Sequence, residues 1–122
     1  MTVQDVLTNV DTVKPNSLDD GVKLMWLNEV ENNVYKIMML RKGSENLKKP
    51  HLNLEDINRE MLLPDEYSGI YTYYVSAMID YSNAETTRYN NSMIMYNSKM
   101  SEFENYWYRT HPQISDGKFG RR

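Results

Sequence analysis

Residues 84–110 read AETTRYNNSMIMYNSKMSEFENYWYRT, and this stretch decides the fold class. Its large apolar residues recur alternately four and three positions apart, which is the spacing of one helix face packed along another helix. The residues of this seam are Tyr89, Met93, Tyr96, Met100, Phe103 and Trp107. The pattern predicts a long helix paired with a second helix of the same chain. An intermolecular coiled coil is the alternative, but such coils usually show longer heptad runs with charged flanks.

Residues 64–82 predict the partner helix. Pro64 suits a first helical turn, and Asp65 and Glu66 place negative charge where the helix dipole favours it. The apolar surface covers more than half of this helix and consists of Tyr67, Ile70, Tyr71, Tyr73, Tyr74, Val75, Met78, Ile79 and Tyr81. The remaining face carries the mostly small groups Gly69, Thr72, Ser76 and Asp80. We expect a central helix whose small face lets another backbone approach closely.

The first 41 residues predict two further helices. Residues 2–13 have apolar groups at helical spacing, with Thr2 placed to cap the helix and Asp5 three positions later. Pro15 ends this helix, and Ser17 is expected to cap a second one over residues 18–41 that stops before Gly43. The apolar stripe of the second helix is Val22, Trp26, Leu27, Val30, Val34, Ile37 and Met38.

The chain is therefore predicted to be all-α, a small bundle of about four helices. Residues 43–63 contain Pro50 and scattered leucines, which predicts a long connection between the second and third helices with one helical turn near residues 55–60. Connections of this length are often functional. We expect one helical domain over residues 1–110, followed by an extended basic tail over residues 111–122 that becomes ordered only through contact.

Composition excludes several classes of protein. A chain of 122 residues fits one domain, and the absence of cysteine excludes disulfides, thiolate zinc sites and cysteine nucleophiles. Apolar runs of at most four residues are far short of the ~20 needed to span a bilayer, and no secretory signal pattern opens the chain. Two histidines and no nucleophile elbow, phosphate loop or dinucleotide motif lead us to expect no enzyme activity, cofactor or metal.

The net charge of −3 is unevenly distributed. Residues 1–108 hold ten Lys and Arg against sixteen Asp and Glu, a net charge of −6, whereas residues 109–122 hold four basic residues and one acid, a net charge of +3. Nucleic-acid-binding domains usually collect basic residues on one face of the fold. An acidic body with a basic tail instead favours docking of the tail onto a partner protein.

Five segments stand in a distinctive order: KPN at 14–16, WLNEVE at 26–31, LLPDEY at 62–67 with YTYY at 71–74, RYNNSM at 88–93 and WYRT at 107–110. In order and spacing they resemble the head-tail connector adaptor proteins of tailed bacteriophages, particularly phages of low-GC Gram-positive bacteria. The resemblance covers nearly the whole chain.

The resemblance implies a structural virion protein without catalytic chemistry. Adaptors of this kind form a homo-oligomeric ring, typically of twelve copies, beneath the portal protein once the genome is packaged. The ring extends the DNA channel, lets DNA pass without specific binding, and docks the next stopper or tail completion protein. The expected location is the virion neck, after synthesis in the cytoplasm of the host bacterium, with no membrane contact.

Three groups of residues are candidate contact sites under this interpretation. The basic, aperiodic tail is the candidate portal-binding segment, with Arg109, His111, Pro112, Lys118, Phe119, Arg121 and Arg122. Off-stripe tyrosines and small groups are the candidate subunit interface, namely Tyr73, Tyr106, Tyr108, Gly69, Thr72 and Ser76. The long connection is the candidate tail-side contact, through Lys48, Lys49, Leu52 and Leu54.

Two other functional classes stay open at this point. A small helical DNA-binding regulator would need a basic recognition helix and salt-sensitive binding to duplex DNA. A minor enzyme or small-molecule binding module would need a pocket with converging polar groups. A gene position just after the portal and capsid genes would support only the connector interpretation.

Overall fold

The computed structural model describes residues 1–113, which have an all-α fold. Its helices are α1 (Val3–Val13), α2 (Asp20–Met38), α3 (Gly69–Ser82) and α4 (Thr86–Thr110), with two 3₁₀ turns, η1 (Leu54–Asp56) and η2 (Asp65–Tyr67). Within the described residues the backbone forms isolated β-bridges between Thr2 and Glu60 and between Arg41 and Gln113 but no strand. The predicted small helical bundle, with a long connection between its second and third helices, is confirmed.

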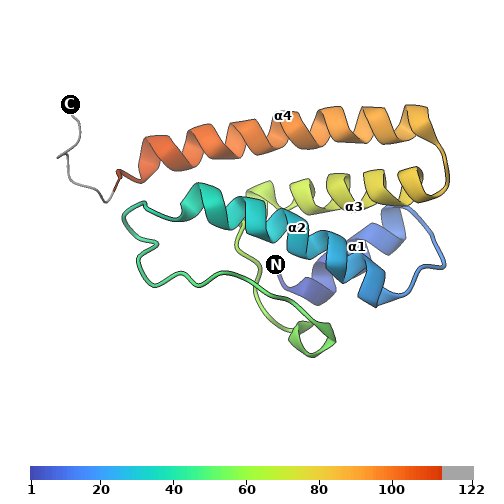
Figure 1. Ribbon diagram of the computed structural model, residues 1–122, viewed down its shortest axis with the longest axis horizontal. Coiled ribbons are helices and arrows are strands. Elements are labelled where there is room, and N and C mark those ends of the chain that lie inside the picture. Colours follow the sequence, from blue (N-terminus) through green and yellow to red (C-terminus); the bar gives the residue numbers. More distant parts are fainter. Residues whose placement is uncertain (114–122) are drawn as a thin grey trace.

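Helix α3 is the centre of the bundle. Figure 1 shows α4 running antiparallel along one side of α3, with α1 and α2 on the other side. The α3–α4 pair is the most extensive helix contact, and it buries Tyr96 and Phe103 of the predicted seam. The ring of Phe103 packs against Tyr67 at a centroid distance of 5.3 Å. The seam therefore joins two helices of one chain, as predicted.

The start of α1 agrees with the sequence in detail. The Thr2 hydroxyl accepts a hydrogen bond from the Asp5 backbone N–H at 3.1 Å, and the Asp5 carboxylate accepts one from the Thr2 N–H at 3.1 Å. This reciprocal pair is a capping box, which satisfies two donors that a helix start leaves free.

The ends of α2 differ from the prediction at both termini. Asp19 rather than Ser17 is the N-cap, with its carboxylate accepting from the Val22 N–H at 3.2 Å. The helix ends at Met38 rather than at residue 41, because Met39 is extended and Leu40 takes a positive φ of 66°. This reversal directs Arg41 toward the end of α4, where it contacts the backbone of His111.

Helix α3 begins at Gly69 rather than at Pro64, because residues 65–67 form the separate turn η2. At its other end, Tyr81 was predicted to belong to the buried stripe but is 65% exposed. Its ring lies beside Tyr89 at 5.3 Å, where the chain turns from α3 into α4. The tip of the helical hairpin thus carries an exposed Tyr81 against a half-buried Tyr89 rather than core.

The long connection is held in place by side chains and backbone of the helices. The Asn28 amide of α2 donates to the Leu52 carbonyl at 2.8 Å and accepts from the Leu52 N–H at 2.7 Å. Near the start of α1, the Val3 N–H donates to the Arg59 carbonyl at 3.0 Å. The predicted helical turn is η1, which is shorter and earlier than residues 55–60.

None of the helices within residues 1–113 combines the length and the hydropathy needed to cross a membrane.

Candidate functional site

A buried carboxylate fixes the relative position of α2, α3 and the long connection. Glu31 of α2 is 1% exposed and accepts hydrogen bonds from the Tyr71 hydroxyl of α3 and from the Leu62 N–H at 2.9 Å. The Tyr71 hydroxyl in turn accepts from the Leu63 N–H at 3.0 Å. Burial raises the pKa of Glu31 above its usual value, against the opposing effect of these hydrogen bonds. Burial, followed by the neighbouring Glu31 charge, also raises the pKa of Tyr71.

The raised pKa of Glu31 predicts a pH-dependent stability. Between its ordinary value of 4.5 and the raised folded value, the unfolded chain releases this proton first, so stability falls as pH rises. The substitution Glu31→Gln removes this titration. We therefore expect the free energy of unfolding of the wild type, minus that of the variant, to decrease as pH increases through this window. Urea unfolding of both proteins at a series of pH values measures the difference, and a constant difference would contradict the assignment.

A second buried carboxylate joins α3 to α1. Asp80 is 1% exposed and forms an ion pair with Lys14 at 2.8 Å. Ser76, one turn earlier on α3, is 7% exposed. The face of small residues on α3 is thus partly covered by α1 of the same chain, and the prediction that Ser76 belongs to a subunit interface is wrong.

Gly69, Thr72 and Tyr73 of the predicted interface line an open hollow of about 410 Å³ between α1 and α3. Its wall on α1 consists of Asn9, Thr12 and Val13, so no charged side chain lines it. The hollow is open at Gly69, because a Cβ added there would meet no atom within 4 Å. It is also open at Val13, whose side chain is 64% exposed. We call this the α1–α3 hollow.

A smaller hollow of about 210 Å³ lies between α3 and α4 and shares Gly69 and Tyr73 with the first. We call it the α3–α4 hollow. It also contains Lys99, which pairs with Glu102 at 3.6 Å. The other lining residues are Glu66, Tyr67 and Ile70, so the hollow has a net negative charge.

The other two predicted interface tyrosines lie toward the end of α4. Tyr106 is half-buried, with its ring 5.4 Å from Tyr67, so much of it belongs to the core. Tyr108 is 37% exposed, and the guanidinium of Arg41 lies 3.9 Å from the centre of its ring. Burial and a hydrogen bond to Glu104 raise the pKa of Tyr108.

The base of the C-terminal tail is attached to the residues that follow α2. The His111 ring stacks on Trp107 at 3.5 Å, and Arg41 Nη1 donates to the His111 carbonyl at 3.2 Å. The Lys42 N–H donates to the Pro112 carbonyl at 2.9 Å. Arg109 is exposed on the last turn of α4. The remaining candidate tail residues lie outside the described part of the chain, namely Lys118, Phe119, Arg121 and Arg122.

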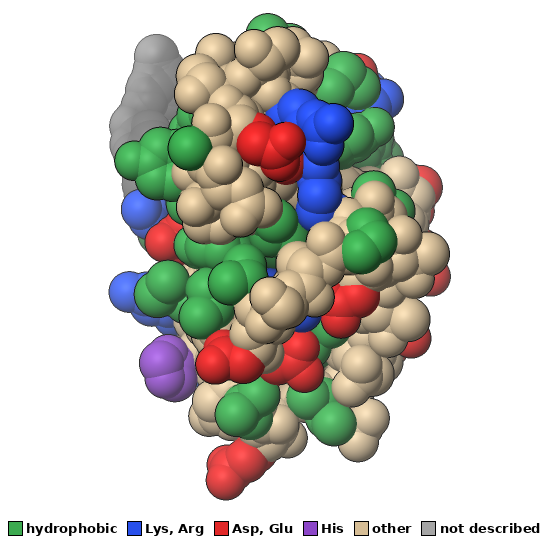
Figure 2. All heavy atoms as spheres, turned by 90° about the vertical axis from the view of Figure 1, so that its right-hand side faces the viewer, with side chains coloured by type: hydrophobic (Ala, Val, Ile, Leu, Met, Phe, Trp, Pro, Cys, Tyr) green, Lys and Arg blue, Asp and Glu red, His purple; other side chains and the backbone are tan. Residues whose placement is uncertain are grey.

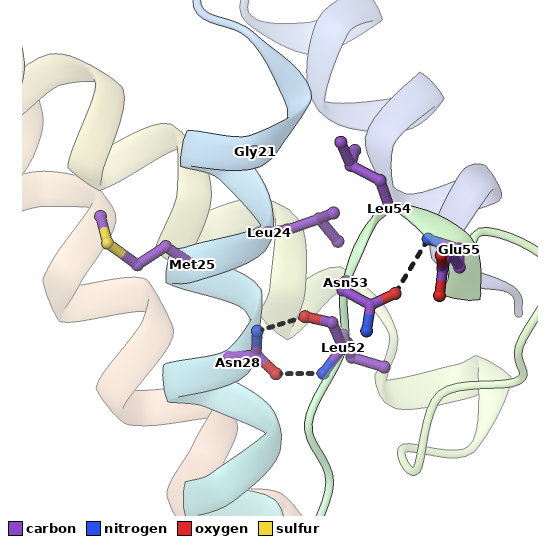
Figure 3. A pocket seen from close by; sticks show the side chains of 8 residues that line it. All are labelled: Gly21, Leu24, Met25, Asn28, Leu52, Asn53, Leu54 and Glu55. Carbon is purple, nitrogen blue, oxygen red and sulfur yellow. Dashed lines mark hydrogen bonds between the residues drawn. The ribbon is translucent and has the colours of Figure 1, made fainter.

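The candidate tail-side contact is only partly at the surface. Lys48 and Lys49 are exposed and Leu54 is 59% exposed, but Leu52 is 3% exposed. Leu52 is held inward by the amide of Asn28, so its prediction as a contact residue is wrong. Figure 3 shows Leu54 facing Leu24 across a hollow of about 460 Å³, whose lining also includes Met25 of α2.

Two residues that the sequence analysis did not select help to shape these surfaces. Met25 interrupts the polar outer side of α2 and is 54% exposed. Arg41, the last residue of the predicted second helix, lies beyond α2 and contacts the base of the tail through His111 and Tyr108. Among residues 1–113 no three His, Asp or Glu side chains converge to hold a metal ion.

Searches against protein-family models, curated proteins and solved structures found no match to this chain.

Proposed function

We propose that the chain is the adaptor subunit of a phage head-tail connector. In this function copies of the chain assemble into a ring below the portal protein, and the ring recruits the next stopper or tail completion protein. The sequence resemblance suggests this function, and the bundle offers exposed apolar groups on separate surfaces, among them Val13 of α1, Leu54 of η1 and Ile94 of α4. A protein that binds several neighbours at once needs such separate surfaces.

The observation that carries the proposal is that the base of the C-terminal segment is fixed to one end of the bundle. Residues 111–113 are attached to residues 41–43 by backbone hydrogen bonds, a β-bridge and the Trp107–His111 stack. The basic residues after position 113 therefore start from a fixed point at one end of the bundle. Because the base of this segment lies at one end of the bundle (Figure 1), a ring stacked on that end is the natural partner for it.

The acidic body is consistent with a DNA channel that does not bind DNA. Figure 2 views the end of the bundle that contains the α3–α4 turn, where acidic side chains are exposed at several separate places among apolar, uncharged and basic groups. The start of α2 contributes Asp19 and Asp20, both exposed. Negative charge of this kind repels phosphates, so a duplex would pass without being held.

A portal-binding assay tests the proposal. We expect the triple variant Lys118→Ala, Arg121→Ala and Arg122→Ala to bind the portal protein encoded in the same genome about tenfold more weakly, because three charge pairs with the portal are lost. Truncation after Gln113 keeps the Lys42–Pro112 hydrogen bond and should abolish binding while leaving the bundle folded. Co-purification and circular dichroism measure the two properties.

The matched control is Lys48→Ala with Lys49→Ala, which removes positive charge from the exposed long connection. This control should bind portal as the wild type does. Undiminished portal binding by the truncated chain would contradict the role of the tail. Salt-sensitive binding of the wild type to duplex DNA, without portal binding, would instead support the DNA-binding regulator.

A further inference from the structure

The two hollows that share Gly69 and Tyr73 of α3 and the outer side of α2 lie on opposite sides of the bundle. On α3, Tyr71 points to α2, and Tyr73 and Gly69 are each two residues away, which is about 200° around the helix. On α2, Met25 is two residues from the fully buried Leu27 and therefore points away from the side of the helix that packs on α3. Since α2 packs directly on α3, the two hollows and the outer side of α2 face in opposite directions.

The outer side of α2 carries two exposed side chains, Met25 and Lys36, which we call the Met25 stripe. Lys36 is two residues beyond the fully buried Val34, so it shares the outward direction of Met25. The two residues are eleven positions apart, about 16 Å along the axis. The long side chain of Lys36 leans toward the helix N-terminus and shortens the distance between its ammonium group and Met25.

The Met25 stripe matches the opposite face in chemistry. The α1–α3 hollow has no charged lining residue, so an apolar side chain such as Met25 could enter it without desolvating a charge. A methionine adapts well to an irregular hollow because its side chain is unbranched and flexible. The α3–α4 hollow carries Glu66 and Glu102 against Lys99 alone, so it suits an added lysine such as Lys36.

The two faces also match in layout. Figure 1 shows α2 crossing the bundle obliquely, with its first turns near the end of α1 and its last turns toward the end of α4. The Lys23–Asp11 ion pair at 2.7 Å and the Asn33–Tyr96 hydrogen bond at 3.3 Å agree with this course. Along the outer side of α2, Met25 is thus nearer the end of α1 and Lys36 nearer the end of α4, and the two hollows follow the same order, from the α1–α3 hollow to the α3–α4 hollow.

We propose that the Met25 stripe of one copy docks onto the two hollows around Tyr73 of the next copy. The contact is heterologous, because each copy uses a different face toward each neighbour, and such contacts generate rings when a small rotation accompanies each step. The inference rests on the proposed ring assembly and specifies which surfaces close it. Three residues of the predicted interface, Gly69, Thr72 and Tyr73, lie on one side of this contact.

Disulfide trapping tests the contact, since the chain contains no cysteine. The double variant Met25→Cys with Thr72→Cys should give a ladder of covalent oligomers under mild oxidation, both at high concentration and when bound to portal. The two positions are on opposite faces of one copy, so no bond forms within a chain. A mixture of the two single variants should give covalent dimers and nothing larger. The control pair Ile94→Cys with Thr72→Cys uses the 64% exposed Ile94 of α4 and should give no ladder.

A charge exchange provides a second, independent measurement. Lys36→Glu and Glu102→Lys should each weaken association of the copies about fivefold in analytical ultracentrifugation, and the combined variant should recover most of the loss. Absence of a ladder in both states, a ladder from the control pair, or dimers of Met25→Cys alone would overturn the proposed contact. If the wild type binds portal but these cross-links do not form, the proposed contact is contradicted and the adaptor function is not. If the cross-links form but the wild type does not bind portal, the adaptor function is contradicted.

Discussion

Glu31→Ala is expected to lower the free energy of unfolding by about 3–5 kcal/mol, because it leaves two buried donors without an acceptor at about 1–3 kcal/mol each and adds a cavity. The donors that would lose their acceptor are the Leu62 N–H and the Tyr71 hydroxyl. A loss of this size is a large share of the about 5–15 kcal/mol that stabilises an ordinary domain. Glu31→Gln keeps an acceptor and should cost less. Urea unfolding followed by circular dichroism provides the measurement.

The matched control for Glu31 is Glu29→Ala on the same helix. Glu29 is exposed and accepts a hydrogen bond from the Tyr74 hydroxyl, so its removal should cost no more than about 1 kcal/mol. If the two alanine variants lose the same free energy of unfolding, the buried carboxylate of Glu31 does not hold α2, α3 and the long connection together.

Phe103→Ala is expected to cost about 3–5 kcal/mol, since the ring is fully buried and its loss leaves a cavity at the α3–α4 contact. The ring packs between Tyr67 at 5.3 Å and Trp107 at 5.7 Å. Thermal and urea unfolding at two protein concentrations measure the effect. Because the α3–α4 contact is within one chain, the loss in free energy of unfolding should not depend on protein concentration. A loss that changes with protein concentration would favour the intermolecular coiled coil.

Ile94→Ala is the control for Phe103 on the same helix. Ile94 is 64% exposed, so its substitution should change stability by at most about 0.5 kcal/mol. A large effect there would mean that the outer side of α4 is buried in solution.

The sequence predicts the helices well where their signals are local. The capping box of Thr2 and Asp5 and the seam of α4 each depend on residues close together in the chain. Ser17 and Asp19 are both good N-caps two positions apart, and the pattern alone does not choose between them. The end of α2 at Met38 leads into a contact between Arg41 and His111, seventy positions away, which no local pattern reveals.

The contact surfaces are harder to predict, because burial depends on which helix covers which face. Ser76 belongs to the predicted small-residue face but is 7% exposed in the folded chain, and Lys14 at the end of α1 pairs with Asp80 one turn later on the same face. Glu31 gave a signal that the sequence analysis overlooked. It lies four residues after Leu27 and three before Val34, on the apolar side of α2, where a charged residue needs buried partners.

The turn between α3 and α4 is a useful place for experimental labels. Asn83 and Ala84 are exposed, and Ala84 has a positive φ of 59°, a backbone conformation that a flexible insertion would relax. Figure 1 places this turn at the end of the bundle opposite the last turn of α4. A fluorophore or affinity peptide inserted there would report on assembly without occupying either the Met25 stripe or the base of the tail.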